Sequence, residues 1–281
     1  MSRTRVFVLT LLAMLAFAAN SLLCRVALKY SAIDAASFTL VRIVSGALVL
    51  WLIVRVRDGR PVAEGSWASA LALFVYAAAF SFAYVSLTAA TGALLLFGAV
   101  QTTMIGVGLY RSEPLRARQV LGLACALAGL VGLLLPGLSA PPVAGSLLML
   151  AAGAAWGVYS LRAKGSGDPL RATAGNFGRA VVFAAALTLV TSPWMAFDSA
   201  GIACAIASGA LASGVGYAVW YTALAGLKVT SAASVQLSVP VIAAVGGIVL
   251  LGEPPTLRLV IASTAILGGI ALVIARPQRA G

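Results

Sequence analysis

The stretch GALLLFGAVQTTMIGVGLYRSEP, residues 92–114, decides the fold, because its long apolar run closes on the acid-proline pair Glu113-Pro114. The same ending returns in SVQLSVPVIAAVGGIVLLGEP, residues 234–254, which closes on Glu253-Pro254. A shift of 140 residues aligns the two stretches without gaps. Charged residues make up only 9% of the chain, so an aligned acid-proline pair is a strong sign of an internal repeat.

Further matches extend this repeat over most of the chain. Pairs that align under shifts of 137 to 140 residues include Arg118 with Arg258, Gly106 with Gly246, Ser21 with Ser160 and Arg42 with Arg179. The matches predict two halves, residues 1–138 and 139–281.

The composition predicts a membrane protein. Of the 281 residues, 62% are hydrophobic and only 9% are charged. Soluble domains carry about 25% charged residues. A helix that crosses a bilayer needs about 20 apolar residues. The sequence predicts ten such spans, at residues 6–28, 35–54, 67–88, 91–110, 117–135, 143–162, 173–192, 199–224, 230–251 and 256–275. The expected fold is therefore all-α, with ten transmembrane helices in two five-helix halves around a central cavity.

The number five is odd, so the second half must enter the membrane from the side opposite to the first. This arrangement is an inverted-topology repeat. The net charge of +12 sets the orientation, because 14 of the 19 Lys and Arg fall in segments on the side of the N-terminus. Arg25, Lys29 and Arg258 fall on the other side. The positive-inside rule then predicts cytoplasmic N- and C-termini, and the same distribution argues against a nucleic-acid role.

The N-terminus resembles a cleavable signal peptide, with basic residues before an apolar core. The apolar run continues to Leu28, longer than a signal core, and favours an uncleaved first span. The three cysteines, Cys24, Cys125 and Cys204, all fall within predicted spans and indicate packing residues, not a disulfide framework.

These features resemble a known family. The chain is similar to the drug/metabolite transporter superfamily, EamA type. The features that carry this resemblance are ten spans in two inverted halves, Trp156-Gly157 in the sixth span, an arginine early in spans two and seven, and Glu-Pro after spans four and nine. The first half departs from this pattern, with Phe17-Ala18 in place of Trp-Gly. More narrowly, LLAMLAFAANSLLCRVAL in the first span resembles bacterial YddG-type aromatic amino acid exporters. The resemblance implies that spans one, three, four, six, eight and nine surround the cavity.

Ionisable side chains inside spans are costly and are candidates for function. All seven Asp and Glu map to loops or span ends, and the chain has no histidine. We therefore expect no embedded proton relay, no metal site and no cofactor. Arg42 and Arg179 are the charges inside spans. They can snorkel to an interface, gate the pathway or bind a substrate carboxylate, and we place them with the candidate gating residues.

Aromatic and polar side chains recur at helical spacing within the spans. The candidate substrate-binding residues are Phe17, Asn20, Ser21, Tyr76, Phe80, Tyr84, Gln101, Trp156, Tyr159, Ser160, Tyr217, Tyr221 and Gln236. The structural alternative is that they hold helices together, as small and hydroxylated residues do in membranes. As a set, they predict an aromatic cavity with few hydrogen-bonding groups, which suits a small amphipathic solute.

Pro240 and Gly246 are the candidate hinge. Proline removes a backbone hydrogen bond and kinks a helix, so Pro240 near the middle of span nine predicts either a hinge or a static kink. The two Glu-Pro pairs have a similar ambiguity. Glu113 and Glu253 can cap the following helix, since proline suits the first helical turn, or act as symmetric gates.

We therefore expect an inner-membrane transporter of a bacterium that exports aromatic and bulky apolar amino acids by alternating access, as a facilitator without an embedded proton relay. The expected partners are the amino acid substrate and the lipid bilayer, with a monomer as the working unit. Alternatives are a broader drug/metabolite exporter, a nucleotide-sugar carrier, a membrane scaffold and a membrane enzyme. A nucleotide-sugar carrier needs basic residues deep in the cavity to neutralise phosphates, and only Arg42 and Arg179 are available, which counts against it. A membrane enzyme would need a catalytic constellation that the sequence lacks, so we expect no enzymatic activity.

Overall fold

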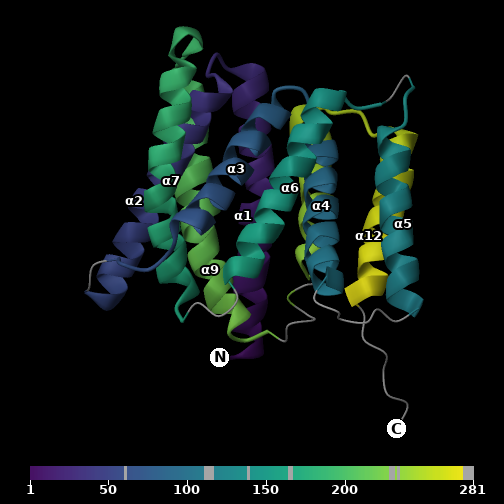
Figure 1. Ribbon diagram of the computed structural model, residues 1–281, viewed down its shortest axis with the longest axis horizontal. Helices are drawn as coiled ribbons and strands as arrows, with labels where there is room; N and C mark the ends of the chain where they lie inside the picture. The colour runs from purple at the N-terminus through teal and green to yellow at the C-terminus, as the bar shows by residue number, and fades with distance from the viewer. Residues whose placement is uncertain are drawn as a thin grey trace.

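The computed structural model describes residues 1–59, 62–110, 117–137, 140–163, 167–227, 232 and 235–274. These residues form a bundle of helices (Figure 1). In chain order the elements are α1 (Arg3–Tyr30), α2 (Ala35–Asp58), α3 (Trp67–Tyr84), α4 (Ala89–Tyr110), α5 (Ala117–Leu134), α6 (Val143–Ala163), α7 (Pro169–Val190), η1 (Ser192–Trp194), α8 (Ser199–Ile206), η2 (Ala207–Val215), α9 (Gly216–Leu224), α11 (Ser238–Leu251) and α12 (Leu257–Ile274).

Within this described part, nine helical segments are long and apolar enough to cross a membrane. They match nine of the ten predicted spans, with boundaries that differ by a few residues. The eighth of them, Ser199–Leu224, comprises α8, η2 and α9. The predicted ninth span corresponds to α11, a shorter apolar helix of 14 residues. Part of the beginning of that span lies outside the described residues, so the count of ten stays a prediction. Glu113-Pro114 lies wholly outside them.

Polar side chains determine where several helices begin. Asp34 accepts hydrogen bonds from the backbone N–H of Ala36 and Ser37 at the start of α2. Asp168 does the same for α7, whose first residue is Pro169, a residue that suits the first turn. At the other end of α2, Gly59 has the positive φ of 67° that favours glycine after a helix.

The helices form two unequal groups. α5 and α12 lie side by side at one edge of the bundle, and α4 is the helix that joins them to the rest (Figure 1). Gly122 of α5 and Gly269 of α12 bring the two backbones together, since a Cβ on either glycine would clash with the carbonyl oxygen of the other. In the larger group α2 packs against α7, α6 packs against α3 and α4, and α1 packs against α9 and α11.

The predicted eighth span is not a uniform α-helix. η2 is a π-helix of nine residues between α8 and α9. In this segment Gly209 packs against the backbone carbonyl of Arg42 in α2, where any Cβ would clash. π-helical segments inside α-helices are uncommon and often occur at functional sites.

Pro240 does not lie in the middle of a helix, which differs from the expectation. Residue 237 is a turn and α11 begins at Ser238, so Pro240 falls in the first helical turn, where its missing N–H leaves no bond unmade. Gly246 lies further along α11, where a Cβ would meet the side chain of Leu22 in α1. The helix is therefore interrupted before the proline.

Candidate functional site

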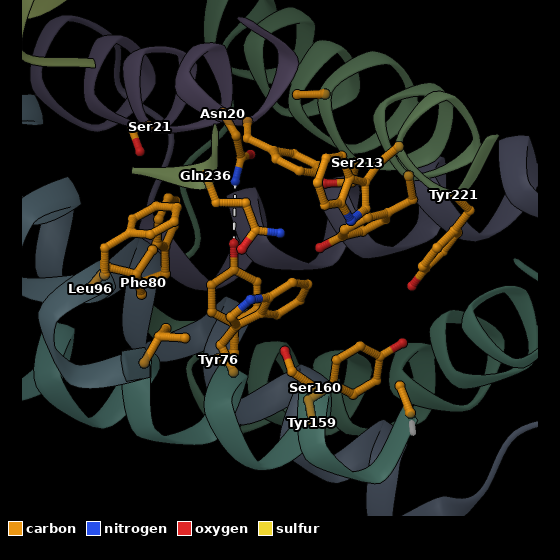
Figure 2. A pocket seen from close by; sticks show the side chains of 18 of the residues that line it. Asn20, Ser21, Tyr76, Phe80, Leu96, Tyr159, Ser160, Ser213, Tyr221 and Gln236 are labelled. Carbon is orange, nitrogen blue, oxygen red and sulfur yellow. Dashed lines mark hydrogen bonds between the residues drawn. The ribbon is translucent and has the colours of Figure 1, made fainter. Parts of the chain in front are cut away.

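A cavity of about 390 Å³ lies inside the larger group of helices. Figure 2 shows its polar and aromatic side chains pointing toward one another from α1, α3, α6 and α9. Its lining consists of Phe17, Asn20, Ser21, Tyr76, Phe80, Leu96, Phe97, Val100, Met104, Trp156, Tyr159, Ser160, Ala163, Pro169, Ala212, Ser213, Tyr217, Trp220, Tyr221, Leu224 and Gln236. The volume falls within the range of about 300–1,000 Å³ that is typical of small-molecule pockets.

Trp156 of α6 is the centre of an aromatic wall. Its ring stacks against Tyr217 of α9, with centroids 5.7 Å apart and an interplanar angle of 16°. It also stacks against Tyr159 at 5.3 Å, and the ring of Tyr76 lies 4.8 Å away. Phe17 of α1 completes this side at 5.7 Å from Tyr217. Such a wall offers flat apolar surface to a solute.

Hydroxyl groups fix the outer part of this wall. The Tyr159 hydroxyl donates to Oγ1 of Thr173 in α7 at 3.3 Å, and it accepts from Nδ2 of Asn176 at 3.4 Å. Thr173 Oγ1 also lies 3.0 Å from the Tyr221 hydroxyl of α9. Thr173 therefore holds two tyrosines from different helices at the cavity.

A second polar group lies at the deeper part of the cavity. Ser208 of η2 donates to Oδ1 of Asn20 at 2.6 Å, which directs Nδ2 of Asn20 toward the Tyr76 hydroxyl at 3.4 Å (Figure 2). Arg42 of α2 donates to the same hydroxyl through Nη2 at 3.1 Å. The guanidinium of Arg42 also lies 4.9 Å from the ring centroid of Phe80.

Beyond Ser21, Phe80 and Leu96 the cavity lining stops. The next residues in that direction are buried, including Tyr84. An ion pair lies there between Nε of Arg25 in α1 and Oε1 of Glu253, at 3.2 Å. Arg25 also donates to the backbone oxygen of Tyr84 at 2.9 Å, and Glu253 accepts from the N–H of Ala89 at 2.8 Å. This end of the cavity is closed by buried polar contacts.

In the other direction the lining continues to Ala163, Pro169 and Leu224, where α6 ends, α7 begins and α9 ends. We call this end of the bundle, where α1 also begins, the N-terminal face; it is the lower end in Figure 1.

Charged residues cluster on the N-terminal face. Arg171 of α7 pairs with Asp58 at 2.9 Å and with Glu64 at 2.6 Å, and Arg57 pairs with Asp58 and Asp168. The hydrogen bond from Arg171 lowers the pKa of Glu64 below its usual value. These contacts join α2 and the following loop to α7.

The structure brings most of the predicted binding residues together. Eleven of the thirteen line the cavity; the exceptions are Tyr84 and Gln101. Tyr84 follows Tyr76 and Phe80 on one face of α3, but it lies one turn beyond the closed end, and its hydroxyl donates to the carbonyl of Ala89 at 3.3 Å. Gln101 lies to the side of the face of α4 that reaches the cavity.

The four candidate gating residues lie outside the lining. Arg42 is 2% exposed and stands directly behind Tyr76 and Phe80. Arg179 instead donates from Nη1 to the carbonyls of Glu64 at 2.8 Å and Gly175 at 3.0 Å. Pro240 and Gly246 lie on α11, as described above.

Arg25 and the apolar lining were not foreseen. Arg25 was expected outside the membrane, but it is 6% exposed inside α1, because Glu253 and two backbone carbonyls compensate its charge there. Leu96, Phe97, Val100 and Met104 carry no sign in the sequence that separates them from other apolar residues of α4. Among the described residues no group of three His, Cys, Asp or Glu is placed to hold a metal ion.

Comparisons with known proteins give one family model, one close relative and one solved structure of similar fold. Residues 143–275 match the model of the EamA-like transporter family. The chain is 60% identical over 273 residues to a protein of Pseudomonas aeruginosa named "Uncharacterized protein PA1977", covering 96% of this chain and 95% of that protein. A solved structure titled "Crystal structure of protein" is 20% identical, with a TM-score of 0.67, covering 97% of this chain and 98% of that one. At this identity it shows the fold alone.

Proposed function

We propose a function from the premise that this chain belongs to one family with PA1977 and carries the EamA-like transporter domain at residues 143–275. It is therefore a multi-pass membrane transporter and not an enzyme. The proposal is that it exports amino acids from a bacterial cell across the inner membrane, with a preference for aromatic and other bulky apolar side chains.

The observation that carries this proposal is the composition of the cavity. Trp156 and the tyrosines around it would stack on a flat or bulky apolar side chain. Asn20, Gln236 and the hydroxyls of Ser160 and Tyr76 supply hydrogen bonds without a fixed negative charge. An aromatic or bulky apolar amino acid matches both properties of the cavity, because it has an apolar side chain and a polar main-chain end.

The difference between the two ends of the cavity supports alternating access. The lining reaches the N-terminal face, while the Arg25–Glu253 ion pair closes the opposite end. With the N-terminus in the cytoplasm, as the charge distribution predicts, this conformation would take up a solute from the cytoplasm. Export then requires that the Arg25–Glu253 contact opens and the contacts of the N-terminal face close, so Glu253 would act as a gate.

The movement needs a hinge, and α11 offers one. Glu253 lies just beyond its end, and a turn at residue 237 precedes its first residue, three positions before Pro240. Gly246 allows α11 to lie close to Leu22 of α1, the helix that carries Arg25. A tilt of α11 about the interruption would separate Glu253 from Arg25.

Among the described residues that line the cavity there is no carboxylate and no histidine. A proton-coupled carrier needs a group that binds and releases a proton along the pathway. We therefore propose a facilitator or exchanger that is driven by the solute gradient.

Counterflow in proteoliposomes tests the function. Vesicles are preloaded with unlabelled phenylalanine, tryptophan, threonine or glutamate, and the uptake of labelled phenylalanine is followed with and without a pH gradient. We expect stimulation by the apolar amino acids, none by glutamate, and no response to the pH gradient. A strong response to the gradient would overturn the facilitator, and the absence of flux in vesicles that hold folded protein would overturn amino acid transport.

One observation favours a second candidate. None of the lining residues that the structure describes is a carboxylate that would pair with the ammonium group of an amino acid. A broader drug/metabolite exporter for uncharged or anionic aromatic compounds would not need one. Counterflow of a labelled uncharged or anionic aromatic compound that amino acids do not inhibit would support this candidate.

A further inference from the structure

Arg42 is a buried cation without a matching anion. It is 2% exposed, and none of the ion pairs among the described residues includes it. Its Nη1 atom is buried and has no hydrogen-bond partner in the described part of the chain. A lone charge at this depth in a membrane protein is expensive unless another group compensates it.

The groups around Arg42 compensate its charge only in part. The rings of Phe80 and Tyr76 lie 4.9 Å and 5.3 Å from the guanidinium carbon, which is the geometry of cation–π contacts. The Tyr76 hydroxyl accepts one hydrogen bond from Nη2. Both aromatic residues are cavity lining, so the charge of Arg42 lies one side chain behind the cavity wall.

Tyr76 can carry this charge to the cavity. Its hydroxyl oxygen accepts from two donors, Nη2 of Arg42 at 3.1 Å and Nδ2 of Asn20 at 3.4 Å. Within the part of the chain that the structure describes, no group accepts the proton of this hydroxyl. A hydroxyl that accepts from a cation becomes a stronger donor, because hydrogen bonds in a chain polarise one another. Ser208 holds the amide of Asn20 in the orientation that this arrangement requires.

We propose that the Tyr76 hydroxyl, polarised by Arg42 and oriented by Asn20, is the site that binds the carboxylate of the solute. The inference rests on the proposed function and adds a selectivity to it. Solutes of this cavity must carry an anionic group beside their apolar part. Arg42 acts through Tyr76 and is a positioning residue, whereas Tyr76 contacts the solute.

The repeat gives a natural comparison for Arg42. Arg179 aligns with Arg42 in the sequence, but its guanidinium donates to backbone carbonyls near the N-terminal face. Among the described residues, no cavity-lining side chain accepts a hydrogen bond from it. A change at Arg179 should leave the preference for an anionic solute unaltered even where it alters the rate of transport.

Competition binding to the purified full-length protein tests the site. The probes are two pairs in which an amide replaces the carboxylate: phenylalanine with phenylalaninamide, and 3-phenylpropanoate with 3-phenylpropanamide. We expect the carboxylate of each pair to bind about tenfold or more tightly than its amide, which is the effect of one charge-assisted hydrogen bond. Tyr76→Phe and Arg42→Gln should bring both ratios close to one, Arg42→Lys should retain part of them, and Arg179→Gln should leave them unchanged.

The outcomes separate the site from the function. Ratios near one in the unaltered protein, or ratios that Tyr76→Phe leaves intact, overturn the carboxylate site while amino acid transport stands. A preference for 3-phenylpropanoate that depends on Tyr76, with neither phenylalanine nor its amide bound, supports the site and overturns amino acid transport. Tyr76→Phe keeps the ring and its packing, so the test holds even if Arg42→Gln fails to fold.

Discussion

Nε of Arg25 lies 3.2 Å from Oε1 of Glu253, and the two side chains are only 8% and 4% exposed. The residues are 228 positions apart in the sequence, so their contact connects the first helix to the last part of the chain. Both side chains have further hydrogen bonds, Arg25 to the carbonyl of Tyr84 and Glu253 from the N–H of Ala89. A buried ion pair with its remaining groups satisfied in this way is a fixed element of the fold in this conformation.

Removal of one partner should therefore destabilise the protein strongly. Glu253→Gln or Arg25→Gln leaves a buried group without its counter-charge, at a cost of about 3–5 kcal/mol. Replacement of both by methionine should cost much less, because apolar residues of similar volume leave no buried charge. Thermal unfolding in detergent measures the three variants. Single variants that unfold at the wild-type temperature would contradict the assigned role of the pair.

The same double variant should alter access to the cavity. Ser21→Cys places a thiol in the lining, in a background with the three native cysteines replaced by alanine. With Arg25 and Glu253 present we expect a membrane-impermeant maleimide to react mainly from the cytoplasmic side of oriented vesicles. With both replaced by methionine, reaction from the opposite side should rise several-fold. An unchanged ratio of the two rates would exclude the pair as a gate.

Trp156 should contribute directly to affinity for aromatic solutes. Trp156→Ala removes the ring that stacks on Tyr159 and Tyr217, and each aromatic contact is worth about 0.5–1.5 kcal/mol beyond the area it buries. The concentration of phenylalanine that half-saturates counterflow should rise by about tenfold. Trp67→Ala is the matched control, since Trp67 is 57% exposed and lies outside the cavity. Equal effects of the two substitutions would refute the assignment.

Two adjacent glycines of α12 should respond in opposite ways to the same substitution. A Cβ on Gly269 would clash with the backbone of Gly122 and Ala126 in α5, whereas a Cβ on Gly268 would meet open space. Gly269→Ala should therefore separate α5 from α12 and lower the unfolding temperature clearly. Gly268→Ala should be neutral or raise stability by up to about 1 kcal/mol, since alanine is the better helix former. Equal melting curves for the two variants would disprove the close packing.

The contacts of the N-terminal face should depend on pH through Glu64. The hydrogen bond from Arg171 lowers the pKa of Glu64, so its contribution to stability is fully present above the ordinary value of 4.5 and disappears as the pH falls through the lower, folded value. Glu64→Gln should therefore lower the unfolding temperature at pH 7 and at pH 5, and the difference from the wild type should vanish in stronger acid. A difference that persists in strong acid would show that Glu64 acts through something other than its charge.

Helix positions were largely predictable from the sequence, because a membrane permits few alternatives to an apolar helix. The periodicity of Tyr76, Phe80 and Tyr84 also indicated the correct face of α3. It could not indicate depth, and Tyr84 lies beyond the end of the cavity for that reason. Periodicity relates residues around a helix axis, but the position of a cavity along that axis depends on helices that are distant in the sequence.

Other features of the site depend on contacts that no local pattern contains. Arg25 looked like a flanking charge, because its compensating partner is Glu253 on another part of the chain. Arg42 and Arg179 aligned in the repeat, yet one lies behind the cavity and the other binds loop carbonyls. The predicted inverted repeat aligned the two arginines without indicating the different surroundings of each.

The π-helix η2 has a consequence for the tyrosines that follow it. Because each residue of an α-helix advances by about 100°, a wider π-turn changes the angular phase between α8 and α9 by on the order of 100° relative to one continuous α-helix. If η2 took up α-helical hydrogen bonds while α8 stayed in place, Tyr217 and Tyr221 would rotate away from Trp156 and Thr173. A change of hydrogen-bond register within nine residues would thus dismantle one wall of the cavity.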